Sequence, residues 1–366
     1  ELIKRTGIDA SKIDEVILGC ANQAGEDNRN VARMSLLLAG LPFTVPGETI
    51  NRLCSSGMSS VIHAHRAIAA GDGDLFIAGG VENMTRGPWV ISKASKAFGR
   101  DSQMFDSSFG WRFVNPKMKE LYGVDGMGVT AENLADKYNI SREDQDKFAY
   151  HSQMKATNAQ CSGRLAEEII SVEIPQRKKD PIIFEHDEFI KGETKLEVLA
   201  KLRTAFKKDG GTVTAGNSSG LNDGAAAMLL ASEKGIKDNN LTPMAKIVSS
   251  AVVGVEPRIM GIGPVMASNK ALAKAGLRMA DMDIIELNEA FSAQALACIR
   301  EWGLKDDDER INPNGGAIAI GHPLGASGTR IIQTAAIELQ KKNKKYALIT
   351  MCIGVGQGYA TIIERV

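Results

Sequence analysis

Asp14-Glu-Val-Ile-Leu18, near the start of the chain, has a counterpart in Asp283-Ile-Ile-Glu-Leu287 in the last third. Cys54 follows Asp14 by 40 residues, and His322 follows Asp283 by 39. Each opens a Gly/Ser-rich turn into a helical pattern, and each helix leads to a strand that ends in glycines. This repetition indicates two copies of one α/β unit, with Cys54 and His322 at matching helix starts. Because few residues are identical between the copies, a chance likeness stays open.

Short apolar, β-rich stretches alternate with helical patterns outside the middle of the chain. The expected strands are Val16–Leu18, Leu75–Ala78, Ile247–Val253, Ile284–Leu287 and Ala347–Met351. The expected helices, with apolar residues three and four apart, are Val31–Ala39, Ser59–Ala70, Val265–Ala275 and Ala326–Gln340. This alternation predicts a largely parallel α/β sheet architecture. The stretch from about Met84 to Leu221 is more polar, with short helical segments (Ser141–Gln160), and we interpret it as an insertion that shapes a substrate site.

The composition excludes several classes of protein. Apolar content of 43% and charged content of 24% disfavour disorder and membrane proteins. The longest apolar runs, such as Ala225–Ala231, fall far short of the ~20 residues that cross a bilayer. The chain has 44 Lys and Arg residues and 44 Asp and Glu residues, so its net charge is neutral. This balance gives no electrostatic argument for binding nucleic acid. Because the chain starts at Glu1 in what reads as a helix tail, we expect preceding residues, and a targeting segment among them stays open.

The cysteines indicate reduced thiols. There are five, an odd number, and no pair has C-x-x-C spacing. This pattern favours an intracellular, cytoplasmic protein without a disulfide framework. No cluster of His, Cys and carboxylates has metal-ligand spacing, so we expect no metal.

Cys54 lies in Asn51-Arg-Leu-Cys-Ser-Ser-Gly57, at the expected start of a helix. The helix dipole and the unpaired amides at such a position stabilise anions, so we expect a lowered thiol pKa and an available thiolate. For this segment alone, the alternative is a small buried residue at a strand–helix junction.

His322 is surrounded by five glycines in Gly315-Gly-Ala-Ile-Ala-Ile-Gly-His-Pro-Leu-Gly-Ala-Ser-Gly328. So many glycines indicate a backbone that other groups approach closely, which favours a functional histidine. Surface or core positions are expected for the other four, His63, His65, His151 and His186.

Cys352 opens Cys-Ile-Gly-Val-Gly-Gln-Gly358, where exposed backbone amides can form an oxyanion hole and the thiol can act as acid or base. Asn288 follows an expected strand in Asn-Glu-Ala-Phe291, at the end where α/β sites form; a helix cap is the alternative. Together, Cys54, His322 and these residues provide the groups for Claisen-type acyl transfer. The glycine clusters match neither the P-loop nor the dinucleotide-binding pattern.

Seven segments, in order and across essentially the whole chain, resemble the thiolase family. They are Asn51–Gly57, Ala78-Gly-Gly-Val-Glu-Asn-Met84, Thr212-Val-Thr-Ala-Gly-Asn217, Asn222-Asp-Gly-Ala225, Asn288–Phe291, Gly321–Gly328 and Cys352-Ile-Gly354. The resemblance implies two similar α/β halves in a five-layer α-β-α-β-α arrangement, at 1–83 plus 223–242 and at 243–366. A loop domain would occupy 84–222, the family's first strand would precede Glu1, and the protein would be a homodimer or homotetramer.

The resemblance also implies a role for each site residue. His322 would activate Cys54, whose thiolate attacks the 3-keto carbon of a 3-oxoacyl-CoA, and Cys352 would protonate the leaving carbanion before CoA takes the acyl group. Asn288, through a water, and His322 would hold the enolate-like oxygen. The backbone amides of Cys54 and Gly354 would hold the other oxyanion. The expected CoA and acyl contacts are Lys191, Ala215, Ser219, Met260, Ala290, Phe291 and Met127. CoA and acyl-CoA are substrates here, and no tightly bound cofactor is implied.

Gly19–Arg33 and Gly110-Trp-Arg-Phe-Val-Asn-Pro116 are most similar to β-ketoadipyl-CoA (3-oxoadipyl-CoA) thiolases. Before Met127, Asp125-Gly126 replaces the Tyr-His pair of acetoacetyl-CoA thiolases, which indicates a less crowded acyl pocket. The candidates for binding a dicarboxylic tail are Arg86, Arg112 and Lys117. The alternatives are an acetoacetyl-CoA thiolase, a fatty 3-ketoacyl-CoA thiolase, a β-ketoacyl synthase and a non-catalytic CoA-binding subunit. A β-ketoacyl synthase is disfavoured because a cysteine stands at 352 in place of a second histidine.

Overall fold

The computed structural model describes residues 1–366 and contains two four-stranded sheets. The first has the order β2-β1-β3-β8, with β1 at Glu15–Gly19, β2 at Gly47–Ile50, β3 at Leu75–Asn83 and β8 at Asp223–Ala231. The second has the order β10-β11-β12-β9, with β9 at Ala245–Gly254, β10 at Ile284–Leu287, β11 at Tyr346–Ile353 and β12 at Gln357–Arg365. All five expected strands are present, and β10 has the expected bounds.

The expectation of largely parallel sheets is wrong for the second sheet. Only β10 and β11 pair in parallel there, whereas β12 is antiparallel to both of its neighbours. In the first sheet β1 is parallel to β2 and β3, but β8 runs antiparallel along β3. The reason in the second sheet is the short turn at 354–356, because a tight turn joins only antiparallel strands and a parallel neighbour needs a long crossover.

Three strands of these two sheets, β2, β8 and β12, were not expected from the sequence. β2 has four residues, none of them fully buried. β8 lies at a sheet edge, where exposed and partly buried positions alternate at its start and no residue is fully buried. β12 begins among the glycines after Cys352, which we interpreted only as a source of backbone amides.

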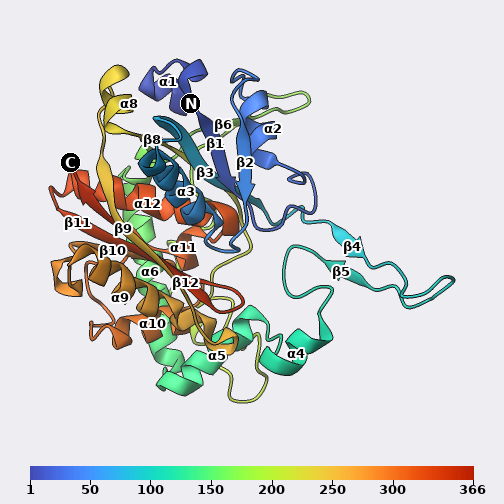
Figure 1. Ribbon diagram of the computed structural model, residues 1–366. Helices are drawn as coiled ribbons and strands as arrows, with labels where there is room; N and C mark the ends of the chain where they lie inside the picture. Colours follow the sequence, from blue (N-terminus) through green and yellow to red (C-terminus); the bar gives the residue numbers. More distant parts are fainter.

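The sheets and helices stack in the expected five layers (Figure 1). Two helices lie between the sheets: α3 at Ser56–Ala70 and α12 at Leu324–Lys341. On the outside, α2 (Val31–Leu38) packs on β1 and β2, and α9 (Gly263–Ala275) packs on β9 and β12, with α10 (Ser292–Glu301) beside it. Neighbouring residues of β10 alternate between core clusters, with Ile284 facing the middle layer and Ile285 facing α10. This alternation is the period of two expected of a strand that is buried on both faces.

The repeat seen in the sequence extends to individual hydrogen bonds. The Asp14 backbone N–H donates to the carbonyl of Leu75 at 2.8 Å, and the Asp14 carboxylate accepts from the Leu75 N–H at 2.9 Å. Asp283 makes the same pair of bonds with Tyr346, at 3.0 and 3.1 Å. In each half, therefore, one aspartate sets the start of two neighbouring parallel strands.

The segment between Asn83 and Asp223 contains mainly short elements. They are β4 (Trp89–Ile91), β5 (Met104–Asp106), α4 (Pro116–Tyr122), α5 (Met127–Tyr138), α6 (Arg142–Cys161), η2 (Leu165–Glu167), β6 (Val172–Ile174), β7 (Ile182–Phe184) and α7 (Leu196–Leu199). The helical pattern expected at Ser141–Gln160 is present as α6, although with 20 residues it is not a short segment. The β4–β5 hairpin extends away from the body of the molecule (Figure 1).

The remaining elements are α1 (Leu2–Thr6), η1 (Ala10–Lys12), α8 (Glu233–Asp238), η3 (Pro257–Ile262), η4 (Met279–Asp281) and α11 (Ala317–Ile320). None of the helices combines the length and apolar character that crossing a membrane requires.

Candidate active site

Cys54 lies two residues before the first residue of α3, in a turn that is held by side-chain hydrogen bonds. The side chain of Asn51 donates to the carbonyl of Ala21 at 2.8 Å and accepts from the Leu53 N–H at 2.9 Å. Leu53 has a positive φ of 48°, which a side chain of its size rarely adopts. The surroundings therefore impose an unfavourable backbone conformation on Leu53, the residue before Cys54.

The Cys54 thiol is a weaker acid than we expected from its helix start. Burial raises its pKa to about 11, although the backbone N–H groups of Gly354 and of Cys54 itself act in the opposite direction. The expectation of a lowered pKa and an available thiolate is therefore wrong for the resting protein, because removal from water outweighs the helix terminus. Cys54 is a thiol at neutral pH and needs a base.

His322 is held at its backbone by the residue that precedes β8. Its N–H donates to the side-chain oxygen of Asn222 at 3.1 Å. The preceding Gly321 has a φ of 101°, and a Cβ added there would lie 2.5 Å from the Asn222 side chain. Glycine is thus required at 321 both for its backbone conformation and for the close approach.

The His322 ring has one defined proton arrangement. Ser327 Oγ lies 2.7 Å from His322 Nδ1 and donates its own proton to the Pro323 carbonyl at 2.9 Å. Ser327 therefore accepts from Nδ1–H, which leaves Nε2 without a proton. Burial, with a smaller effect of Arg330, lowers the His322 pKa to about 4. A neutral ring with a free Nε2 is the form that can accept a proton at neutral pH.

Asn288 and Cys352 lie at the ends of the neighbouring parallel strands β10 and β11. The Asn288 N–H donates to the carbonyl of Thr350 at 3.0 Å, and its side-chain nitrogen lies 3.4 Å from His322 Nε2. Its side-chain oxygen is buried without a partner. Burial, and then the neighbouring Cys54, raise the pKa of Cys352 well above its usual value. Four candidate residues from four segments thus converge at the junction of the two halves.

Two buried carboxylates support this arrangement, and our sequence reasoning assigned a role to neither. Glu82 accepts from the backbone N–H groups of Ala21, Asn22 and Gly325 at 2.8 to 3.0 Å. Glu289, next to Asn288, accepts from Ser152 and Asn312 at 2.6 Å each and fixes the loop that precedes α11. Both glutamates lie inside segments that resemble the thiolase family. An acidic residue within an otherwise apolar or glycine-rich segment was the signal that could have indicated their role.

Glu82 also forms a cluster with Cys20 and Asp27, whose ligand atoms all lie within 4.8 Å of one another. Both oxygens of Glu82 already accept backbone N–H groups, and the Cys20 thiol donates to Asp27 at 3.8 Å. These carboxylate oxygens face N–H donors, so the cluster is explained by hydrogen bonding alone.

The structure brings together several of the expected CoA contacts. The Ser219 N–H donates to the carbonyl of Ala290 at 3.0 Å, and an isolated bridge pairs Ser218 with Phe291. Met127 Sδ lies beside Gly354, within 3.7 Å of where a Cβ would stand. The expected Met260, by contrast, has a side chain only 2% exposed within the outer core of the second half.

Ala215 and Lys191 reach the same region from the loop segment. Ala215 is exposed in a turn closed by the side chain of Asn217, which accepts from the Thr214 N–H at 2.8 Å. The Lys191 ammonium stacks 5.5 Å above the ring of Phe189, which packs on Gly220.

Arg203 is a cation that our sequence reasoning missed. It is exposed and has no ion pair, and the adjacent Thr204 pairs with Thr214 beside Ala215. A lone arginine in a polar loop carries no signal in the sequence. Only the bridge between these two segments places it near the expected CoA contacts.

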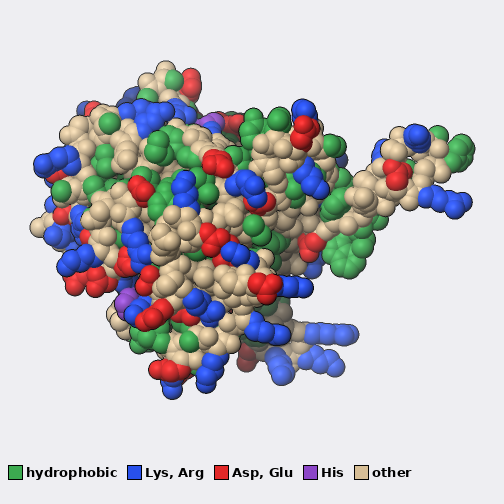
Figure 2. Space-filling model, turned by 90° about the horizontal axis from the view of Figure 1, so that it is seen from below, with side chains coloured by type: hydrophobic (Ala, Val, Ile, Leu, Met, Phe, Trp, Pro, Cys, Tyr) green, Lys and Arg blue, Asp and Glu red, His purple; other side chains and the backbone are tan.

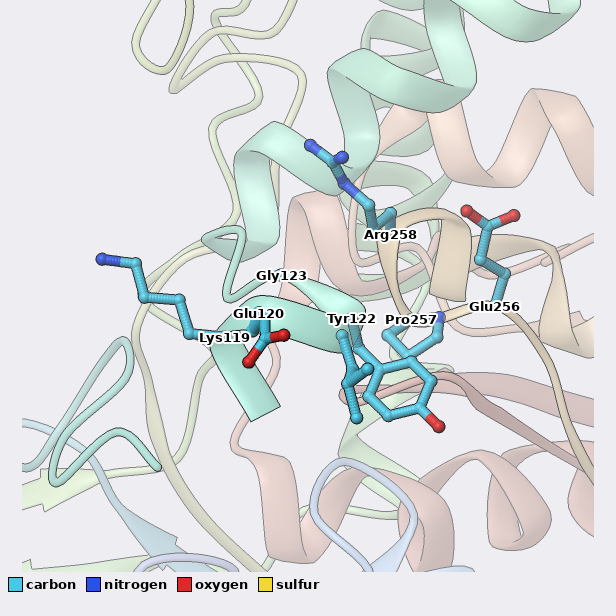
Figure 3. A pocket seen from close by; sticks show the side chains of 8 residues that line it. Lys119, Glu120, Tyr122, Gly123, Glu256, Pro257 and Arg258 are labelled. Atoms are coloured by element: carbon cyan, nitrogen blue, oxygen red, sulfur yellow. The ribbon is translucent and has the colours of Figure 1, made fainter. Parts of the chain in front are cut away.

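A cavity of about 260 Å³ lies apart from these residues, between α4 and η3. Its lining includes Lys119, Tyr122, Glu256 and Arg258. Figure 3 shows these side chains pointing away from one another instead of converging on one point. This cavity therefore lacks the convergent polar groups of a ligand site.

Comparison with known families identifies the class of protein. The model described as "Thiolase, N-terminal domain" matches residues 1–234, and that described as "Thiolase, C-terminal domain" matches residues 241–365. The chain belongs to the thiolase family. This confirms the family and the fold expected from the motifs, and it makes the protein an acyltransferase.

Individual members of the thiolase family are also similar to this chain over nearly its whole length. The "3-oxoadipyl-CoA/3-oxo-5,6-dehydrosuberyl-CoA thiolase" of Escherichia coli (strain K12) is 58% identical over 365 residues, covering 100% of this chain and 91% of the relative. A "Beta-ketoadipyl-CoA thiolase" of Acinetobacter baylyi is 57% identical over 366 residues, with the same coverage. Among solved structures, the Bacillus anthracis acetyl-CoA acetyltransferase has a TM-score of 0.89 and 39% identity, covering 100% of this chain and 90% of that chain.

Proposed function

We propose that this enzyme cleaves 3-oxoadipyl-CoA with free CoA to give acetyl-CoA and succinyl-CoA. The bond between carbons 2 and 3 of the acyl chain breaks. Carbon 3 and the rest of the chain pass to the sulfur of Cys54, and carbon 2 leaves with CoA as a carbanion that takes up one proton. A second CoA thiol then takes the acyl group from Cys54. Its proton returns to Cys352, and the proton held by His322 returns to the Cys54 sulfur, so that the reaction balances and is reversible.

In the first step, His322 Nε2 accepts the proton of the Cys54 thiol as the sulfur attacks carbon 3. The neutral ring and the Nδ1–H bond to Ser327 support this role. The backbone N–H groups of Cys54 and Gly354, which already face the sulfur, are the donors that would hold the oxyanion on carbon 3.

Cys352 supplies the proton for the leaving carbanion. Its raised pKa keeps it a thiol at neutral pH, which is the form that a general acid requires. The enolate-like oxygen of the leaving group is held by His322 and by Asn288. The unpartnered side-chain oxygen of Asn288 is an acceptor that a bound water would satisfy.

The convergence of Cys54, His322, Asn288 and Cys352 is the observation that supports acyl transfer. The dicarboxylic substrate rests on the relatives named for 3-oxoadipyl-CoA or β-ketoadipyl-CoA, at 57–58% identity over essentially the whole chain. An acetyl-CoA acetyltransferase of Chromobacterium violaceum is less similar, at 48%. Cleavage of acetoacetyl-CoA is therefore the second candidate.

We also propose that the protein is a cytoplasmic homodimer or homotetramer. The β4–β5 hairpin carries Trp89, 69% exposed, and Phe98, 103% exposed. Figure 2 shows hydrophobic and basic side chains along this arm, away from the body. A two-stranded hairpin alone is marginally stable, so contact with further copies of the chain would explain the arm. The five free cysteines support a reducing compartment.

The test is a comparison of rates of CoA thiolysis. Acetoacetyl-CoA, a medium-chain 3-oxoacyl-CoA and 3-oxoadipyl-CoA are offered at equal concentration, and acetyl-CoA is measured. We expect the highest kcat/KM with 3-oxoadipyl-CoA. A preference for acetoacetyl-CoA would transfer the assignment to the second candidate, and no cleavage of any substrate would contradict the proposed reaction.

A further inference from the structure

Trp111 and Arg112 are held from both sides of the proposed acyl site. On one side, the indole N–H of Trp111 donates to the carbonyl of Asp125 at 3.1 Å, two residues before Met127. On the other side, Arg112 Nη2 donates to the side-chain oxygen of Asn22 at 2.9 Å. This short segment therefore joins two loops that are otherwise far apart in the sequence.

Both of these loops adjoin Cys54. Met127 lies beside Leu53 and Gly354, the residues around the Cys54 sulfur. On the side of Asn22, the neighbouring Ala21 carbonyl accepts from the side chain of Asn51, three residues before Cys54. Trp111 and Arg112 thus connect the two loops that flank the proposed nucleophile.

Arg112 is partly buried and has no carboxylate partner. Its two hydrogen bonds go to neutral oxygens, those of Asn22 and of the Ser107 carbonyl, at 2.9 and 3.1 Å. A guanidinium has five N–H donors in a planar fork that matches a carboxylate. A cation that is withdrawn from water without an opposite charge is costly, and an anionic ligand would supply that charge.

Arg86 and Lys117, the other two candidates for binding the dicarboxylic tail, differ from Arg112 both in burial and in ion pairing. Arg86 already pairs with Glu26, and Lys117 with Glu120. Their side chains are each 68% exposed. Exposed ion pairs of this kind are satisfied in water and contribute little.

The proposed acyl group is short. On Cys54 it would be succinyl, whose two carboxyl carbons are separated by three carbon–carbon bonds of about 1.5 Å each. Its free carboxylate therefore stays within about one side-chain length of the sulfur and ends among the loops that adjoin Cys54.

We propose that Arg112 binds the terminal carboxylate of the substrate and selects 3-oxodicarboxylyl-CoA over neutral 3-oxoacyl-CoA. The inference rests on the proposed function and adds the residue that would read the far end of the acyl chain. Asn22 and the Ser107 carbonyl orient the guanidinium, and Trp111 fixes the segment against the loop of Met127.

The test uses two substrates that differ only at the chain end. These are 3-oxoadipyl-CoA and 3-oxohexanoyl-CoA, which has a methyl group in place of the terminal carboxylate. Arg112→Gln is expected to lower the ratio of their kcat/KM values, charged over neutral, by about 10- to 150-fold, the range for losing a hydrogen bond to a charged group. Arg112→Lys keeps the charge without the fork and is expected to fall between wild type and Arg112→Gln.

The control is Arg86→Gln, which removes a nearby exposed arginine and should leave the ratio unchanged. Turnover of 3-oxohexanoyl-CoA shows that each variant is folded. Equal loss on both substrates, or no loss, would overturn the role of Arg112. Failure of the wild-type enzyme to cleave 3-oxoadipyl-CoA while it cleaves 3-oxohexanoyl-CoA would instead contradict the proposed substrate.

Discussion

The carboxylate of Glu82, in the first half of the molecule, accepts a 2.8 Å hydrogen bond from the backbone N–H of Gly325, in the first turn of α12. Gly325 lies three residues after His322, and the same carboxylate binds the N–H of Ala21, whose carbonyl receives Asn51. One buried side chain is thereby linked to the backbone around both His322 and Cys54.

Glu82→Gln is expected to destabilise the protein. A glutamine keeps one acceptor oxygen but turns an N–H₂ group toward the backbone donors, so at least one buried N–H loses its partner. The cost is about 1–3 kcal/mol, measured as the free energy of unfolding in urea. Glu48→Gln, at an exposed position of β2, is the control and should change little. Equal stability of the two variants would contradict the bridging role.

Ser327→Ala is expected to lower kcat about tenfold, because His322 Nδ1–H loses its acceptor and the ring is no longer held in one tautomer. Ring-nitrogen NMR shifts should report a mixture of tautomers in the variant. Ser268→Ala provides the control, since this buried hydroxyl in α9 has no partner. The assignment of the tautomer fails if the wild-type spectrum shows the proton on Nε2.

Cys54→Ala is expected to abolish the covalent acyl-enzyme while the protein remains folded and binds CoA. Intact-mass measurement after mixing with acetyl-CoA should show one acetyl group on the wild type and none on the variant. Cys161→Ala, at an exposed cysteine at the end of α6, should acetylate like the wild type. Acetylation of the Cys54 variant would contradict the assignment of Cys54 as the nucleophile.

The alkylation of Cys54 should reveal its high pKa. The reactive form is the thiolate, so the iodoacetamide inactivation rate should rise with pH towards about 11. A resting ion pair with His322 would instead give a rate that is already constant near neutral pH, and that profile would contradict the neutral thiol.

Glu286→Gln should stabilise the protein at alkaline pH. Burial raises the pKa of Glu286 to about 8, and one of its oxygens has no partner. The folded protein holds this proton above the usual pKa of 4.5, so the contribution to stability is full below pH 4.5 and falls as pH rises through 8. The melting temperature of the variant should therefore exceed that of the wild type at pH 8 by more than at pH 5. The corresponding gain in the free energy of unfolding is up to about 4 kcal/mol. A gain that is independent of pH would show that titration of Glu286 is not the cause.

The sequence predicted the central elements better than the edges. β10 was predicted with its observed bounds because Ile284, Ile285 and Leu287 form a short apolar run, interrupted only by Glu286, with a polar residue at each side. β8 is rich in alanine and forms a strand by pairing along β3, whereas β12 contains the β-branched, apolar run Tyr359–Ile363, which we did not assign. The matching roles of Asp14 and Asp283 support the repeat, which residue identity alone left open.

By itself the sequence determined the chemistry available to this protein: two cysteines, a histidine and an asparagine in thiolase motifs at strand ends and helix starts. Only the tertiary structure decided their protonation, because the pKa of Cys54 depends on burial and on the amide of Gly354, 300 residues along the chain. It also decided that Arg112, unlike Arg86, has no carboxylate partner. These properties depend on contacts such as that of Glu82 with Gly325, 243 residues apart, which no local pattern encodes.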